Sequence, residues 1–523
     1  MMLLGGLLVA WSKKTLIAGA LTLTAANIIT RLIGFAYRIF MADAVGAAGM
    51  GLFQLIMPIY SLAWAISCSG ITTTLSRLVA AEQAKGESGN MRRLLLISLG
   101  MTGFLSLGMT IALYFGAGLI GAGILNEPRI VLSLRILSFS FVFMALGSCL
   151  RGYFLGLQKT IVPAISQILE QLARIGVIML LAAAFIPRGL EYAAAMAVIG
   201  IVIGETLSFL YVFLAYKLSK KRKALERASA PTLGKRAAFF AIGAMALPLT
   251  LNRITSSFLS TVENVMIPGR LQAYGMAADE AMATFGSITG MAMPLIFFPS
   301  AILVALSISL VPSIAESITL GQNLRVNSTI TKSITFTCIV AFAAAAIFVT
   351  FPYEIGNLVY RQDLRQILLI LGLMCPLWYL NITLNGILSG LGEQIFIFRT
   401  SLMASAINIA FVFFFVPRYG TIAFLVGWFV SLIIITYFDA AKIREITRLR
   451  IQILRWFFKP ALAALAAGLI VNYIHDGLVL QIFEELPALI VSLSMLMGMY
   501  GIFVVLLGAI SIQDIRMILN LKK

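Results

Sequence analysis

Two arginines lie inside an apolar segment near the start of the chain, where their spacing suggests a site for an anion. Arg31 and Arg38 belong to residues 25–41, part of an apolar run long enough to cross a bilayer. A helix would place both on one stripe with Asn27 and Gly34, with the two side-chain stems about 10 Å apart along the axis. Because a charge at the bilayer centre costs roughly 2.5–3.5 kcal/mol, such an arginine usually faces a wet cavity or a partner. We therefore predict a cationic cavity in which Arg31, Arg38 and Asn27 bind an anionic group.

Other roles stay open for these two arginines. Either side chain could snorkel to the outer surface of the membrane or form a structural ion pair, and Asp43 closely follows Arg38 in the sequence. Arg31 lies deeper in the expected span than Arg38 does, so the cavity role suits Arg31 better.

A second polar stretch, residues 248–264, lies within an expected membrane span and also carries an arginine. A helix in contact with lipid would not be this polar, so the stretch is expected to line water or protein. Hydroxyl groups and an arginine suit the oxygens of a phosphate, since arginine donates paired, charge-assisted hydrogen bonds. The residues expected to bind the substrate here are Arg253, Asn252, Ser256 and Ser257, with Ser260, Asn264 and Glu263 on or beside the same stripe.

Carboxylates in three expected spans are candidates for gating transport or for coupling it to an ion, H+ or Na+. Glu170 and Arg174 are four residues apart, so they can pair on one helix face, either as a structural ion pair or as a gate that opens and closes. Glu205 has no cation near it in the sequence; it could carry a proton or pair with a residue of another helix such as Arg174. Glu263 is the third candidate.

Composition identifies the class of protein. The chain has 523 residues, of which 60% are hydrophobic and 11% charged, which is typical of a polytopic membrane protein and not of a soluble one. We expect an all-α fold with about fourteen transmembrane helices, arranged as two six-helix lobes and two additional C-terminal helices. Internal similarity supports the lobes, because expected spans two and eight each carry an early Met-Pro pair and end on Ala-Glu. The predicted parts are 15–216 for the first lobe, 217–236 for a basic cytoplasmic linker, 237–440 for the second lobe, 441–459 for an amphipathic interfacial segment and 460–511 for the last two spans.

The distribution of basic residues predicts the orientation in the cell membrane. With the N-terminus in the cytoplasm, 28 of the 39 Lys and Arg residues, Arg151 among them, fall on the cytoplasmic side and 7 on the outer side. Cytoplasmic loops carry an excess of Lys and Arg, so we expect a multi-pass protein with both termini in the cytoplasm. The net charge of +18 then reflects this orientation and not a nucleic-acid partner.

Several chemistries are not expected from this sequence. His475 is the single histidine, so no histidine-based metal site or proton relay can form, and the four cysteines form no CxxC pair. The sequence contains neither a Walker A phosphate-binding loop nor an HExxH motif. We therefore expect no enzyme activity, no cofactor and no metal site, apart from a coupling ion.

Two stretches near the N-terminus resemble the opening of a known transporter superfamily. Residues 30–38, T-R-L-I-G-F-A-Y-R, and residues 49–58, G-M-G-L-F-Q-L-I-M-P, are similar to the start of the multidrug/oligosaccharidyl-lipid/polysaccharide (MOP) exporters. Residues 246–271, A-L-P-L-T-L-N-R-I-T-S-S-F-L-S-T-V-E-N-V-M-I-P-G-R-L, resemble the stage V sporulation protein B family, a polysaccharide biosynthesis and lipid flippase branch. The resemblance covers essentially the whole chain.

This resemblance implies a V-shaped, two-lobed bundle that alternates between inward-open and outward-open states. In the lipid II flippases of the superfamily, arginines of the first span help to form a cationic cavity, and Arg31 matches the first of them. The second usually comes six residues later, where this chain has Tyr37; Arg38 is one residue further on, a shift of about 100° around a helix. The resemblance also implies that the last two spans extend a groove for a lipid tail, and it associates the branch with the spore cortex, a peptidoglycan layer.

The resulting expectation is a flippase for an undecaprenyl-pyrophosphate-linked saccharide, a lipid II-like peptidoglycan precursor, that works by alternating access in spore cortex and cell-wall synthesis. Its expected partners are this polyprenyl-pyrophosphate-linked sugar lipid, the bilayer and cell-wall synthesis enzymes. Two alternatives stay open. An ion-coupled multidrug exporter of the same superfamily would need an acidic cavity. In a non-transporting membrane scaffold for cortex-synthesis enzymes, the cavity arginines would be dispensable.

Overall fold

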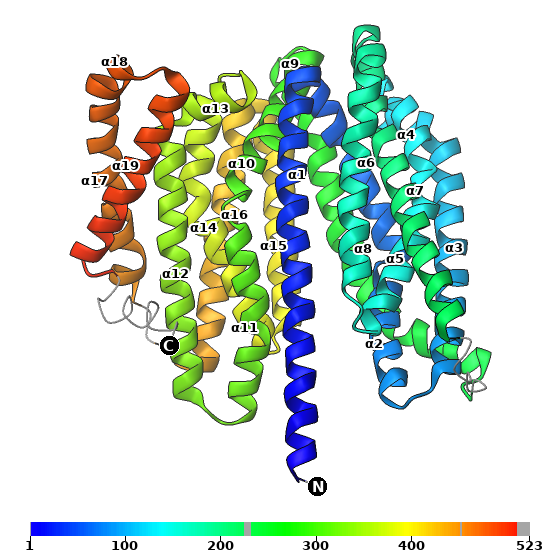
Figure 1. Ribbon diagram of the computed structural model, residues 1–523. Helices are drawn as coiled ribbons and strands as arrows, with labels where there is room; N and C mark the ends of the chain where they lie inside the picture. The colour runs from blue at the N-terminus through cyan, green and yellow to red at the C-terminus, as the bar shows by residue number, and fades with distance from the viewer. Residues whose placement is uncertain (1, 224–231, 450–451, 510–523) are drawn as a thin grey trace. The chain divides into compact units, whose positions relative to one another are not determined.

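A computed structural model describes residues 2–223, 232–449 and 452–509 of the chain. Within these ranges every regular element is a helix (Figure 1). A backbone that crosses a bilayer must satisfy its own N–H and C=O groups, and a helix does so within a single segment. The prediction of an all-α membrane protein is confirmed.

The chain divides into two compact units. The first comprises Met1–Gly269 with Ala277–Gly286, and the second comprises Arg270–Met276 with Ser287–Lys523. Part of the predicted linker, residues 224–231, lies outside the described ranges. The predicted boundaries of the two lobes therefore stay predictions.

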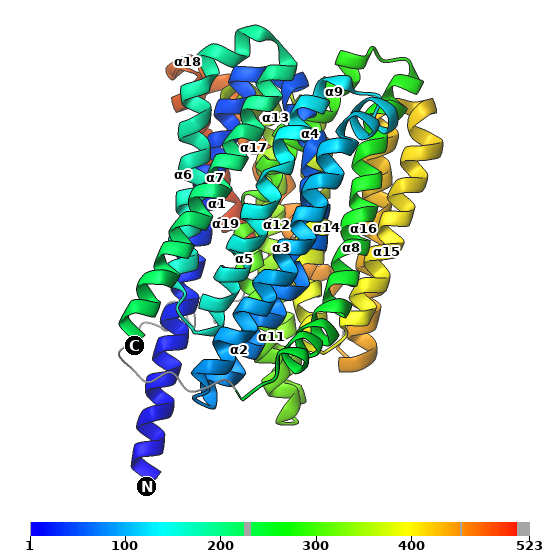
Figure 2. The ribbon, with the colours of Figure 1, turned by 90° about the vertical axis from the view of Figure 1, so that its right-hand side faces the viewer.

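Long helices that pack side by side build the first unit. Helices α6 and α7 pack along each other, and both contact α1. Figure 2 shows α5 between α3 and α7, and α5 contacts both of them. The elements are α1 (Met2–Trp64), η1 (Ala65–Ser69), α2 (Gly70–Ala84), α3 (Ser88–Gly118), η2 (Leu119–Ile124), η3 (Pro128–Ile130), α4 (Val131–Ser138), α5 (Ser140–Gly156), α6 (Ile161–Phe185), η4 (Ile186–Arg188), α7 (Leu190–Lys223), α8 (Lys235–Tyr274, to Gly269 in this unit) and α9 (Ala278–Gly286).

The second unit has the same all-helical construction. Helix α14 packs against α12 on one side and α16 on another, and α17 packs against α12 and α19 (Figure 1). Its elements are η5 (Ser287–Ala292), α10 (Met293–Phe297), α11 (Ala301–Thr319), α12 (Asn323–Thr350), α13 (Pro352–Tyr360), α14 (Arg365–Gly390), α15 (Gln394–Ala410), η6 (Phe411–Phe415), α16 (Val416–Thr447), η7 (Leu454–Phe458), α17 (Lys459–Ile474), η8 (His475–Val479), α18 (Leu480–Ile482) and α19 (Glu485–Leu506).

The described residues cover most of two segments that the sequence predicted in this unit. The predicted interfacial segment 441–459 begins inside α16, continues beyond the undescribed residues 450–451 and ends with η7 at the start of α17. The predicted last two spans, 460–511, contain α17 and α19, and residues 510–511 lie outside the described ranges.

The number of membrane crossings follows from helix length and composition. Among the described residues, 11 helical stretches are long and apolar enough, or 12 if the bent pair that contains α4 and α5 counts as one span. Two of these stretches, Ala26–Ala84 and Gln394–Thr447, contain 59 and 54 residues, whereas about 20 residues suffice for one crossing. They break at Gly46 (φ 68°) and Gly420 (φ 61°), in the left-handed region that favours glycine, so each has the length for two crossings. The count of fourteen stays a prediction.

Glycines hold α9 close to α1 inside the first unit. A Cβ atom at Gly286 of α9 would overlap the backbone carbonyl oxygen of Ala47, and one at Gly51 of α1 would overlap that of Met282. Backbone cannot give way as a flexible side chain can, so both positions require glycine. The close approach fixes α9 against the part of α1 that follows Gly46.

We predict that Gly286→Ala lowers the free energy of unfolding by about 1–3 kcal/mol, the usual cost of overpacking a core. Gly100→Ala is the matched control, because a Cβ at Gly100 of α3 would meet no atom within 4 Å. Removing a helical glycine there should be neutral or stabilising by up to about 1 kcal/mol. Thermal unfolding of the purified protein in detergent measures both, and equal midpoints for the two variants would contradict the packing described.

Candidate functional site

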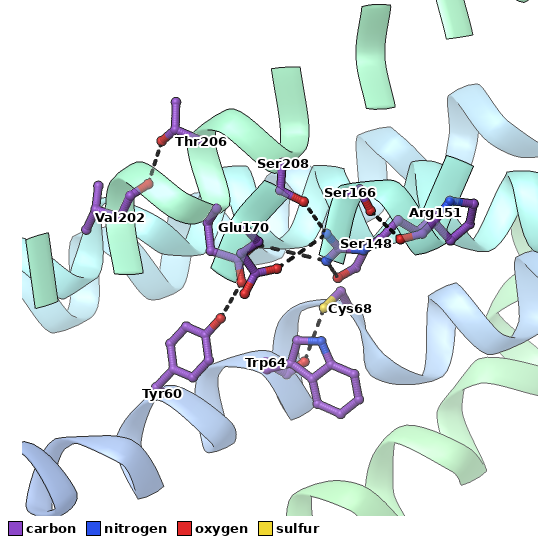
Figure 3. A network of polar contacts seen from close by, with 12 residues as sticks. Tyr60, Trp64, Cys68, Ser148, Arg151, Ser166, Glu170, Val202, Thr206 and Ser208 are labelled. Carbon is purple, nitrogen blue, oxygen red and sulfur yellow. Dashed lines mark hydrogen bonds and ion pairs between the residues drawn. The ribbon is translucent and has the colours of Figure 1, made fainter. Parts of the chain in front are cut away.

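Four helices of the first unit contribute polar side chains to one network (Figure 3). Arg151 of α5 lies between two carboxylates: its Nη1 is 4.0 Å from Oε2 of Glu170 on α6, and its Nη2 is 4.0 Å from Oε2 of Glu205 on α7. The same guanidinium donates hydrogen bonds of 2.9 Å to the hydroxyl oxygens of Ser208 and Ser148. One arginine therefore ties α5 to both α6 and α7.

Each carboxylate has a second partner. Arg174 donates a 3.0 Å hydrogen bond from Nη2 to Oε1 of Glu170, one turn earlier on α6. Tyr60 of α1 donates a 2.5 Å hydrogen bond to Oε1 of Glu205, which is 3% exposed. Two guanidinium groups and two carboxylates cancel in charge, which offsets much of the cost of taking them out of water.

Helix periodicity and close packing bring these side chains together. Ser148 and Arg151 are three residues apart on α5, and i,i+3 residues share a helix face. Helices α6 and α7 approach each other at Gly204, where a Cβ would lie 2.9 Å from the backbone oxygen of Glu170. A larger residue at this position would push α7 away and take Glu205 out of reach of Arg151.

The structure brings together three of the residues predicted to gate or couple transport, namely Glu170, Arg174 and Glu205. The first two pair on one helix face, as their spacing predicts. Glu205 is not an isolated carboxylate, and its partners are Arg151 and Tyr60 and not Arg174. The fourth candidate, Glu263, lies on α8 and is buried.

Two members of the network were missed by sequence reasoning. Arg151 was counted among the cytoplasmic positions and not among the candidate site residues, but its half-buried side chain points into the bundle, toward Glu170 and Glu205. The only local signal was its position three residues after Ser148, within an apolar helix. Tyr60 is separated from Glu205 by 145 residues, and an uncharged residue in an apolar run gives no sign of such a partner.

The network retains unused hydrogen-bonding capacity. Oε2 of Glu205 and Nε of Arg174 are buried and have no hydrogen-bond partner among the described residues. The same holds for Oε1 of Gln167 and of Gln171, on the same helix as Arg174. Most buried polar atoms in proteins have a partner, so the three oxygens suit a proton, a cation or a water that exchanges during function, and the N–H of Arg174 suits a water.

The predicted anion-binding residues have a different setting, because several of them are exposed in the first unit. On α1, Asn27 and Arg31 are exposed, whereas Arg38 is half-buried. Among the described residues, no hydrogen bond or ion pair of the Arg31 side chain is found. Arg31 therefore keeps all its donors for a ligand, and Arg38 differs from it in environment as well as in helical phase.

Arg253 of α8 is also exposed, and its guanidinium carbon lies 5.4 Å from the ring centroid of Trp64. A guanidinium stacked on an aromatic ring keeps its in-plane N–H donors available. Asn252 and Ser256 are exposed beside it, and Ser257 is half-buried. The hydroxyl of Ser256 donates to the carbonyl of Asn252 at 3.1 Å, so the amide of Asn252 and the guanidinium of Arg253 are better candidate donors for a phosphate than this serine.

Arg31 and Arg253 lie at similar depth. Figure 1 shows α1 rising from the N-terminus and the chain returning from its upper end toward α2. Arg31 is 15 residues before the break at Gly46, and Trp64 is 18 residues after it. At 1.5 Å per residue, Arg31 and Trp64 lie about 22 and 27 Å from Gly46 along their helical segments. Since Arg253 contacts Trp64, the two exposed arginines lie within about one helical turn of the same level.

We predict that Arg151→Gln costs about 3–5 kcal/mol of stability, because it leaves the buried Glu205 carboxylate with Tyr60 alone. Arg174→Gln should cost less, since Glu170 still faces Arg151. Adding Glu205→Gln to Arg151→Gln should restore part of the lost stability. Thermal unfolding of the unmodified protein, the two single variants and the double variant measures these differences. If Arg174→Gln is the more damaging single change, Arg151 is not the centre of the network.

Comparison with known proteins places this chain in a family. The family model described as "Polysaccharide biosynthesis protein" matches residues 16–318. Stage V sporulation protein B of Bacillus subtilis (strain 168) is 28% identical over 447 residues, which cover 84% of this chain and 86% of that protein. Lipid II flippase MurJ of the same organism is 25% identical over 411 residues, 73% of this chain and 74% of the relative.

A solved structure agrees with this assignment at the level of the fold. The structure of lipid II flippase MurJ in an inward closed conformation superposes with a TM-score of 0.69 at 16% identity, covering 92% of this chain and 97% of that one. The chain therefore belongs to the polysaccharide biosynthesis protein family, and it is similar to stage V sporulation protein B and to lipid II flippase MurJ.

Proposed function

We propose that this protein is a flippase that carries an undecaprenyl-pyrophosphate-linked saccharide across the cytoplasmic membrane by alternating access. The substrate we infer is a lipid II-like peptidoglycan precursor used in spore cortex or cell-wall synthesis. The names of two relatives, a stage V sporulation protein and a lipid II flippase, support this class of substrate. The cell membrane is the proposed location, with both termini in the cytoplasm.

The single observation that carries the proposal is the difference in exposure between two arginines and three carboxylates of the first unit. Arg31 and Arg253 are exposed, whereas Glu205 and Glu263 are buried and Glu170 is held in ion pairs. Exposed guanidinium groups on α1 and α8, beside carboxylates of α6, α7 and α8 that are buried or ion-paired, suit an anionic cargo. A cationic drug would need the opposite arrangement, so this observation favours the flippase over the multidrug exporter.

A pyrophosphate fits the chemistry of these arginines. It carries several negatively charged oxygens, and a guanidinium donates two parallel hydrogen bonds to such a group. In our proposal Arg31 and Arg253 bind the pyrophosphate from two helices at one level, and Asn27 and Asn252 add amide donors. The polyprenyl tail stays in the lipid while the saccharide crosses through water and protein.

The network around Arg151 is the proposed coupling or gating element. With both carboxylates charged, the two guanidinium groups are neutralised and α1, α5, α6 and α7 are held together. A proton on Glu170 or Glu205 would leave the network with one excess positive charge and weaken this link. In our proposal, this network couples lipid transport to H+ or Na+, or responds to the membrane potential.

We predict that Arg31→Ala abolishes lipid flipping while the protein still inserts and folds, since an exposed side chain contributes little to packing. The measurement is translocation of a fluorescent polyprenyl-pyrophosphate saccharide in proteoliposomes. Arg188→Ala, which removes an exposed arginine after α6, is the control and should flip lipid at the normal rate. Normal flipping by Arg31→Ala would refute the role of Arg31 in binding the headgroup and would favour the scaffold alternative.

A further inference from the structure

The second unit contains a cavity with a largely apolar lining. Its volume is about 120 Å³, and it lies where α12, α14 and α16 meet the segment of chain that leads into η7. Cys338 of α12, Leu384 of α14 and Ile443 of α16 are among the side chains that line it. A dry cavity of about 150 Å³ can hold a molecule of the size of benzene. This cavity therefore has room for part of an acyl chain but not for a saccharide.

The cavity is separate from the groove that the last two spans are expected to form. Its lining ends with Trp456 and Phe457 of η7, before α17 begins at Lys459, and none of the described residues of α17 or α19 belongs to it. The ring of Phe457 packs edge-to-face on that of Phe342 of α12, with 4.9 Å between the centroids, which holds η7 against α12. The cavity is therefore a feature of α12, α14, α16 and η7.

Two hydrogen-bond donors interrupt the apolar lining. Trp456 is 6% exposed, and its buried indole Nε1 has no hydrogen-bond partner among the described residues. An indole N–H can only donate, and a buried one usually has an acceptor. Arg444 of α16 also lines the cavity and is exposed, and no hydrogen bond or ion pair of its guanidinium is found within the described ranges. Both side chains thus suit a ligand that brings acceptors and negative charge.

The charged neighbours of these two residues already have partners. The carboxylate of Glu445 is 3.2 Å from Nζ of Lys442. Arg455 donates a 3.3 Å hydrogen bond from Nε to the carbonyl oxygen of Ala509, and Lys459 donates one of 3.3 Å to that of Gly508. The positive charge of Arg444 is therefore left unbalanced by the described residues around the cavity.

We propose that this cavity binds an anionic membrane phospholipid, with part of one acyl chain inside it and the phosphate on Arg444. The indole N–H of Trp456 donates to an ester oxygen of the same lipid. Arg444 is one of the residues predicted to lie on the cytoplasmic side, where basic pockets between helices bind anionic head groups. A phospholipid without net charge would leave the charge of Arg444 unbalanced. The site does not depend on the identity of the transported lipid.

A lipid that binds only the native state raises the unfolding midpoint. Purified full-length protein in a neutral detergent is unfolded thermally with increasing phosphatidylglycerol or phosphatidylcholine. We expect a rise that saturates with phosphatidylglycerol and little response to phosphatidylcholine. Arg444→Gln should raise the phosphatidylglycerol concentration for the half-maximal rise by about tenfold, because one charge-assisted contact is lost. Arg399→Gln is the matched control; it removes an exposed arginine of α15 that does not line the cavity, and it should respond as the unmodified protein does.

A second variant distinguishes an acyl chain in the cavity from attraction of anionic lipid to a basic surface. Ala440→Leu fills part of the cavity and leaves Arg444 in place, so this variant should fold normally and lose most of the rise with phosphatidylglycerol. Photocrosslinking of phosphatidylglycerol with a diazirine in its acyl chain to the peptide that contains Trp456 is an independent readout on the unmodified protein.

Equal responses to the two phospholipids would overturn the proposal, as would an unchanged response to phosphatidylglycerol in Arg444→Gln and Ala440→Leu. Crosslinking of the Trp456 peptide by a diazirine analogue of undecaprenyl pyrophosphate, and not by phosphatidylglycerol, would also overturn it and would assign the cavity to the transported lipid.

Discussion

The cost of placing charge inside an apolar bundle governs this structure. In the first unit, Arg151 lies between Glu170 and Glu205, and the charges of the network cancel. Arg31 and Arg253 stay exposed. Pairing offsets the penalty of burying the charges of the network, and in the proposed mechanism the exposed arginines face water and the anionic headgroup. Paired charges hold helices together, and exposed charges remain available to bind a ligand.

The exposed arginines and the paired charges are suited to two different roles, anion binding and the linking of helices. These roles would interfere with each other if the same residues served both. A carboxylate next to Arg31 or Arg253 would compete with an anionic headgroup for the same donors. The first unit instead holds Glu170 and Glu205 in the network, where Arg151, Arg174 and Tyr60 occupy them. Trp64 positions Arg253 by its ring face and leaves the guanidinium edge free. In the proposed mechanism, the binding surface and the link between helices can therefore change independently.

The sequence alone predicted those features of the structure that depend on local sequence pattern. Hydropathy predicted an all-helical membrane protein, and the i,i+4 spacing predicted the pair of Glu170 and Arg174. It could not identify the partners of Glu205, because Tyr60 and Arg151 come from other helices and only tertiary packing brings them close.

The number and boundaries of the membrane spans also depend on more than local sequence pattern. Hydropathy locates apolar stretches, but helices continue through positions where a span was expected to end. Residues 441–447, for example, continue α16. A glycine in the left-handed region, such as Gly46 or Gly420, redirects the chain within a single helical stretch, and its backbone conformation cannot be read from composition.

The claim at the centre of this account is that Arg31 and Arg253 bind one pyrophosphate group. The most direct measurement is the affinity of the protein in nanodiscs for undecaprenyl pyrophosphate, compared among the unmodified chain, Arg31→Gln, Arg253→Gln and the double variant. The account predicts that each single change weakens binding and that the two effects are not additive, because both side chains contact the same ligand. Unchanged affinity in both single variants would contradict it.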